Sequence, residues 1–210
     1  MRPCHVSLPA AFALSSFMPQ TGEAWIEALA KRHADFELQA VMIQELAASD
    51  LDNRDSLLRQ VSGWHLRYAR DKLLILQGFA SLGEIEDPAR LLLKQVLREE
   101  SRRHLDVVLN ILGCLDPSRS MSYVRAGLAS QNRQLWAQAM ESALQFRKER
   151  GVFRELAQLF EAQREGVALA GGPPGGKHAM KAWLEWCQEY GSTWLAECAR
   201  YCQSSNRVTS

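Results

Sequence analysis

The chain has 210 residues, of which 47% are hydrophobic, and this is enough apolar material for one domain with its own core. Its 25 basic and 24 acidic side chains leave a net charge of +1, so bulk charge points neither to nucleic acid nor to a membrane surface. Five cysteines without a CxxC pair argue against a closed disulfide framework. We therefore expect a cytoplasmic protein whose reduced thiols pack as small hydrophobes.

The first 20 residues form an apolar stretch that follows one arginine and is interrupted by Pro9. No clear cleavage site follows, so we interpret residues 1–20 as a loose N-terminal extension, with a weak signal peptide as the alternative. No run in the chain approaches the roughly 18 to 20 apolar residues that a membrane span requires. We expect no transmembrane segment.

Apolar residues then recur at helical spacing. The pattern predicts two helices between residues 21 and 48, followed by a turn cluster at 49–53. The next helix carries Leu57 and Val61. Another helix is expected to start near Arg70-Asp71 and to end at Leu82-Gly83, where glycine suits a helix terminus.

Two segments in the middle of the chain open in the same way. Asp87-Pro88 and Asp116-Pro117 each place a capping carboxylate before a proline, which fits the first helical position. In the first segment we expect one helix up to about residue 98 and a second one capped by Ser101. A shift of about 31 residues superposes Leu105 on Trp136 and aligns the two segments. The pattern predicts a repeated pair of helices.

Beyond these units a helix is expected around 152–160, followed by a loop insertion at about 166–178. Gly171, Gly176 and Lys177 have the spacing of a phosphate-binding loop, but His178 replaces the Ser or Thr that would hold Mg²⁺. Too few residues follow for the sheet that nucleotide hydrolysis needs, so we interpret the segment as an ordinary loop. A terminal helix pair broken at Gly191-Ser192 and a polar tail at 204–210 complete the chain.

Residues that could carry chemistry are sparse. Glu100 and His104 lie one helical turn apart, and His33 lies near acidic residues, but such pairs are typical of solvated helix faces. Neither an HExxH motif nor a G-x-S-x-G elbow is present. The sequence thus predicts no catalytic residue, no metal ligand and no cofactor, and we expect a non-enzyme.

Charge is concentrated in the middle of the chain, where residues 88–154 carry 12 basic and 6 acidic side chains. Solvated helix faces are one interpretation of this excess, and a strip that binds an acidic partner or phosphate is the other. We predict a partner-binding surface there. Its candidate residues are Arg98, Arg102, Arg119, Arg125, Arg133, Arg147, Arg150 and Arg154.

Two stretches, LLLKQVLREESRRHLDVVLNILGCL and AGLASQNRQLWAQAMESALQF, resemble HEAT-like repeats, and the resemblance covers about residues 55–203. No alternating β pattern of useful length appears in the chain, so we expect an all-α fold. The resemblance implies a short right-handed α-solenoid of four or five helix pairs, forming one domain over 21–203. It also implies a non-catalytic scaffold that binds a protein or another domain. AQAMESALQF and STWLAECARY further resemble the HEAT tail of some bacterial major-facilitator or nucleotide-translocase-like proteins, which implies a regulatory module of a transporter-like protein.

The alternative is a nucleic-acid-binding or DNA-repair protein that resembles the HEAT-like alkylpurine DNA glycosylases. That resemblance implies a basic concave face with a tryptophan and a carboxylate. Trp136 is the aromatic residue that we nominate in the basic segment. Its place on an apolar stripe predicts a core position instead.

Overall fold

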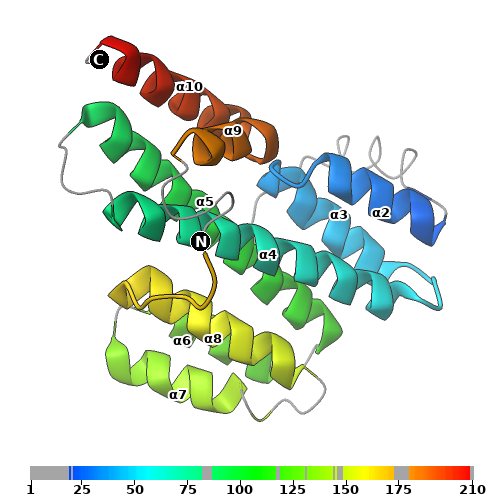
Figure 1. Cartoon of the computed structure of the whole chain (residues 1–210). Helices are drawn as coiled ribbons and strands as arrows, with labels where there is room; N and C mark the ends of the chain where they lie inside the picture. Colours follow the sequence, from blue (N-terminus) through cyan, green and yellow to red (C-terminus); the bar gives the residue numbers. More distant parts are fainter. Residues whose placement is uncertain are drawn as a thin grey trace.

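The computed structural model describes residues 19, 21–81, 87–116, 119–130, 132–143, 145, 149–172 and 180–208 (Figure 1). Within these residues the protein is all-α, without a strand, as expected. The helices are α2 (Gly22–Lys31), α3 (Phe36–Ala48), α4 (Arg54–Ser81), α5 (Pro88–Leu115), α6 (Arg119–Ala129), α7 (Arg133–Ala143), α8 (Arg150–Glu165), α9 (Met180–Tyr190) and α10 (Thr193–Val208). None of these helices has both the length and the hydropathy that crossing a bilayer requires.

Two 28-residue helices, α4 and α5, form the centre of the molecule. They run antiparallel, because His65 on α4 faces His104 on α5 while Ala69 faces Ser101. Asp87 begins α5 as predicted, since its carboxylate accepts a hydrogen bond from the Ala89 amide at 3.0 Å. This long pair supplies surface for all the other hairpins.

The shorter helices surround the central pair (Figure 1). The N-terminal hairpin α2–α3 packs on both α4 and α5, and α10 of the C-terminal hairpin packs along α5. On the other side lie α6, α7 and α8, with α8 against α4 (Figure 1). The first and last hairpins therefore share the same two helices as their support.

The expected helix breaks near Arg70-Asp71 and before Ser101 are wrong, since α4 is a single helix as far as Ser81 and α5 is a single helix from Pro88 to Leu115. The helix end expected at Leu82-Gly83 lies outside the described residues. Arg70-Asp71 lies inside α4, and Ser101 lies inside α5. Ser101 caps nothing: its buried hydroxyl donates to the carbonyl of Ala69 at 3.3 Å, across the helix pair. No proline or glycine stands at either expected break, so the backbone continues its helix.

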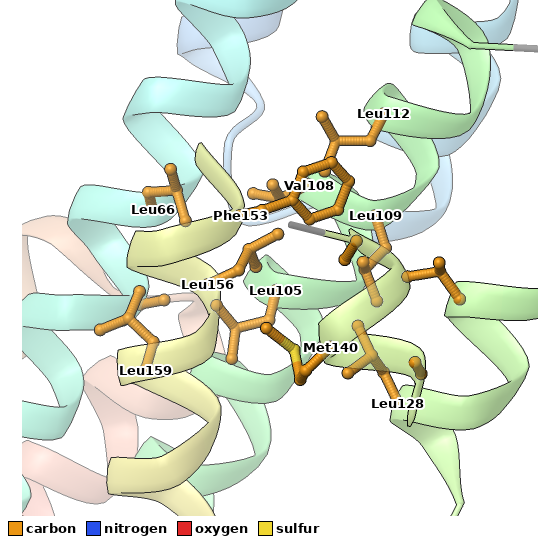
Figure 2. Close-up of a cluster of buried hydrophobic side chains, with 14 of the residues drawn as sticks. Leu66, Leu105, Val108, Leu109, Leu112, Leu128, Met140, Phe153, Leu156 and Leu159 are labelled. Atoms are coloured by element: carbon orange, nitrogen blue, oxygen red, sulfur yellow. The ribbon is translucent and has the colours of Figure 1, made fainter. Parts of the chain in front are cut away.

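Three apolar clusters fill the spaces between the hairpins. Figure 2 shows the largest, in which Leu105 and Leu109 of α5 meet Leu128 of α6, Met140 of α7 and Phe153 of α8. The described cysteines are free thiols, and those of α9 and α10 are buried in the second cluster, as expected of packing residues.

A non-helical segment follows α8 and is tied to α4. Gly166 ends the helix with φ +69°, a conformation that favours glycine. The Gln77 side chain then donates to the Val167 carbonyl at 2.8 Å and accepts from the Leu169 amide at 3.1 Å. Residues 173–179, which include Gly176 and Lys177 of the expected loop, lie outside the described residues. The expected extension 1–20, apart from Pro19, also lies outside them. The tail expected at 204–210 is helical as far as Val208.

Candidate arginine-lined groove

A groove with a volume of about 660 Å³ opens between α5, α6, α7 and α8. Its position follows from the fold, because α6 and α8 pack against α5 while α7 packs on α6 and α8. It is lined by Gln95, Arg98, Glu99, Arg102, Asp106, Leu109, Arg125, Leu128, Ser130, Trp136, Phe160, Gln163 and Arg164.

Four arginines from three helices line this groove. Arg98 and Arg102 lie one turn apart on α5, while Arg125 comes from α6 and Arg164 from α8. Below them the groove is apolar, since Leu109 and Leu128 belong to the core shown in Figure 2. A basic rim above an apolar floor suits a ligand that combines negative charge with hydrophobic surface.

Two carboxylates lie among the arginines. Glu99 forms an ion pair with Arg103 at 2.6 Å on the exposed side of α5. Burial raises the pKa of Asp106 from its ordinary value, while the nearby guanidinium groups of Arg102 and Arg125 act in the opposite direction. Asp106 is thus a partly desolvated carboxylate that shares its surroundings with two of the groove arginines.

Trp136 corrects one expectation from the sequence. Its apolar stripe predicted a core residue, but it is only partly buried and lines the groove. The guanidinium carbon of Arg164 lies 5.9 Å from the centre of its ring, within the range of a cation–π contact. The stripe misleads because α7 is a short helix at the edge of the fold, where one helical face touches both the core and the groove.

The structure divides the eight candidate arginines. Arg98, Arg102 and Arg125 meet in the groove. Arg133 lies elsewhere and faces Glu165 at 3.6 Å, with both side chains exposed. The exposed Arg150 and Arg154 of α8 are also absent from the lining, and the side chains of Arg119 and Arg147 lie outside the described residues.

The charge pattern does not identify Arg164 as a groove residue, because Arg164 lies beyond the segment with excess basic charge. The α8 helix brings it to the groove, and the Gln163 amide next to it donates to the carbonyl of Arg98 at 3.0 Å. This hydrogen bond fixes α8 against α5 at the groove. Only the packing of α8 could have identified Arg164.

A second group of polar residues contradicts the sequence-based expectation of solvated faces. Glu100, His104 and Lys72 are all buried, with Lys72 at 0% exposure. The Nδ1 atom of His65, a residue with no motif around it, lies 2.8 Å from Nδ1 of His104. Helical periodicity does not indicate that these residues are buried. The sequence pattern of charged side chains is the same whether or not a neighbouring hairpin covers them.

Within the part of the chain that the structure describes, no group of three or more His, Cys, Asp or Glu side chains is placed to hold a metal ion. In comparisons with known proteins, no family model, no curated protein and no solved structure matched this chain.

Proposed function

We propose that this chain is a non-catalytic binding module that captures an acidic segment of a partner protein, or of another domain, in the arginine-lined groove. One observation carries the proposal: Arg98, Arg102, Arg125 and Arg164, drawn from three helices, surround a single apolar floor. Guanidinium groups pair with carboxylates in a planar, two-bonded geometry, which makes arginine well suited to such recognition.

The mixture of charges favours a peptide over a run of phosphates. Glu99 and Asp106 line the groove together with the arginines and would repel closely spaced phosphates. A peptide can place carboxylates beside the arginines and an apolar side chain over Leu109 and Leu128. A groove of about 660 Å³ holds a few residues of such a segment.

The test uses a fluorescently labelled peptide in which a leucine or phenylalanine is flanked by glutamates, with its lysine-flanked counterpart as a control. Fluorescence anisotropy should show binding of the acidic peptide only. In the double variant Arg98→Glu/Arg125→Glu the affinity for the acidic peptide should fall at least tenfold, because each change both removes an attraction and adds a repulsion.

Arg133→Glu/Arg154→Glu provides the matched control, since this double variant makes the same charge change at two exposed residues outside the groove. It should leave the affinity within about twofold, because exposed charges contribute little at a distance. Equal losses in the groove and control variants would show a general charge effect and would contradict this placement of the site.

The alternative function is nucleic-acid binding of the HEAT-like DNA-repair kind, and Trp136 is the observation that favours it. A partly buried aromatic ring beside an arginine, in a basic groove, can stack on an unpaired base. Labelled single- and double-stranded DNA and RNA belong in the same anisotropy experiment. Binding that weakens steeply with salt, and that Trp136→Ala abolishes, would favour this alternative over the peptide.

The finer fold assignment stays a prediction. A HEAT-like solenoid requires successive helix pairs, and the pairs α2–α3, α4–α5, α6–α7 and α9–α10 would serve as its units. The regulatory module of a transporter-like protein also stays a prediction, tested by whether the chain binds the soluble face of such a protein. We propose a cytoplasmic location, which the free thiols in the described part of the chain support.

A further inference from the structure

A continuous line of buried hydrogen bonds crosses the molecule away from the groove. Lys72 Nζ lies 3.2 Å from His104 Nε2, and His104 Nδ1 lies 2.8 Å from His65 Nδ1. His65 Nε2 lies 3.3 Å from the Gln39 Oε1 atom, and the Gln39 amide nitrogen donates to the Leu29 carbonyl at 2.6 Å. All four side chains are at most 1% exposed.

The partners fix the direction of every bond in this line. Because a carbonyl only accepts, Gln39 must present its nitrogen to Leu29 and its oxygen to His65, so His65 donates from Nε2. A neutral His65 then accepts at Nδ1, and the donor is the Nδ1–H of His104. The remaining His104 nitrogen accepts from the Lys72 ammonium. Each histidine is therefore neutral and in one tautomer, His104 with the proton on Nδ1 and His65 with the proton on Nε2.

An added proton has no place in this arrangement. On His65 it would set two N–H groups head to head across 2.8 Å, and on His104 it would point an N–H at the Lys72 ammonium 3.2 Å away. Burial, together with the nearby positive charge, lowers the pKa of His65 to about 3 and that of His104 well below its ordinary value. Protonation therefore requires the buried residues to separate.

Other titratable groups lie beside the pair, or beside Lys72 and His33, which act on it. Lys72 and Asp71 lie on α4 with Tyr68, Glu100 lies on α5, Cys187 and Tyr190 lie on α9, and His33 lies between α2 and α3. Among them, Glu100 is the nearest negative charge to Lys72, at 3.6 Å. It does not neutralise a second positive charge, because it is already opposed by the lysine.

The same residues attach the C-terminal hairpin to the central pair. Ser192, in the turn between α9 and α10, donates to Glu100, and its oxygen also accepts from the Leu195 amide at the start of α10. The Lys72 ammonium lies 5.2 Å from the ring centre of Trp186 on α9. The Tyr190 carbonyl at the end of α9 lies 3.2 Å from His33 Nε2. Displacing Lys72 would disturb the first two of these attachments.

We propose that the His65–His104 pair is an acid-sensitive latch, which holds the α9–α10 hairpin on α4 and α5 at neutral pH and loosens it when the pair is protonated. The protonated pair repels Lys72, which leaves both Glu100 and Trp186. Glu100, which accepts the hydrogen bond of Ser192, then loses the positive charge of Lys72. The hairpin keeps its apolar contacts with α4 and α5 but loses two of its polar attachments, and it therefore loosens.

Thiol labelling tests the latch directly, because α9 and α10 carry Cys187, Cys198 and Cys202, all buried. Cys4 and Cys114 are first replaced by serine. The reagent is 4,4′-dithiodipyridine, which reacts with thiols in acidic solution, and each rate is divided by that of the urea-unfolded protein at the same pH. We expect the normalised rate to rise at least tenfold between pH 7.5 and pH 5. An unchanged rate would overturn the proposal.

Variants assign the response to the pair. In His65→Gln/His104→Gln the pair has no imidazole left to be protonated, so the rise between pH 7.5 and pH 5 should disappear. His33→Gln is the matched control, and it should retain the rise. A rise that persists in the double variant and disappears in His33→Gln would place the switch at His33 and overturn the latch.

A measurement on the unmodified protein covers the case in which the double variant does not fold. Nitrogen-15 spectra of the histidine rings distinguish the two neutral tautomers and the imidazolium. At pH 7.5 we expect His104 to be protonated on Nδ1 only and His65 on Nε2 only. Both tautomers should persist down to the pH at which the thiols become reactive. An imidazolium at either residue at pH 7.5 would overturn the proposal.

Discussion

At the scale of the residue, the side chains that matter most are those whose surroundings differ from what their chemical type suggests. Lys72 is fully buried between aromatic rings, and Trp136, expected in the core, lines the groove. Gly78 is another example: α4 and the Trp183 ring of α9 approach each other so closely that a side chain at this position has no space. Glycine is needed here for its size.

Gly78→Ala should destabilise the protein by about 1 to 3 kcal/mol, because the new methyl group would lie 2.5 Å from a carbon of the buried Trp183 ring. Gly63→Ala is the control on the same helix, where an added Cβ meets nothing within 4 Å. That change should stabilise the helix by up to about 1 kcal/mol, since alanine is the better helix former. Urea unfolding compares the two variants. Equal effects would mean that α9 does not pack on Gly78.

At the scale of the element, the local rules for helix ends hold and the rules for helix continuity fail. Asp87 and Thr21 both cap helices with their side chains, as their residue types predict. The serine at position 101 is of the same capping type, yet it lies in the middle of α5. The difference is that α4 gives Ser101 a hydrogen-bond acceptor, the Ala69 carbonyl, within an unbroken helix.

Asp87→Ala should cost about 0.5 to 2 kcal/mol of unfolding free energy, since the Ala89 amide loses its capping partner. Asp87→Asn is the matched control, because it keeps a capping oxygen while removing the charge. It should cost less than the alanine variant. If both variants lose the same amount in urea unfolding, the ion pair of Asp87 with Arg90 matters more than the cap.

At the scale of the whole molecule, three hairpins depend on one long helix pair. The groove residues Arg98 and Arg102 and the buried residues Glu100 and His104 alternate along the same stretch of α5. One helix thus carries the candidate binding site toward α6–α8 and the candidate latch toward α3 and α9–α10. Its position between the hairpins explains why charged residues with similar spacing serve different purposes.

The free energy of unfolding should fall as the pH drops below about 6.5. His65 and His104 have folded pKa values below their unfolded value, so the unfolded chain binds more protons in this range. Each histidine that stays neutral in the folded protein lowers the free energy of unfolding by up to about 1.4 kcal/mol for each unit by which the pH falls. Asp71 and Asp106, whose pKa values burial raises, act in the opposite sense. Urea unfolding at pH 7.5, 6.5 and 5.5 tests this, and a constant midpoint would contradict it.

The sequence by itself determined the all-α class, the cap at Asp87, the packing role of the described cysteines and the excess of basic residues in the middle of the chain. These features depend on local spacing and residue type, which a linear pattern records. Only the tertiary structure decided that α4 and α5 are unbroken, that Arg164 reaches the groove, and that Lys72, His65 and His104 are buried together. The reason is physical: burial and pairing depend on which hairpin covers a helical face, and residues distant in the chain, such as Ser192 and Gln39, provide that cover.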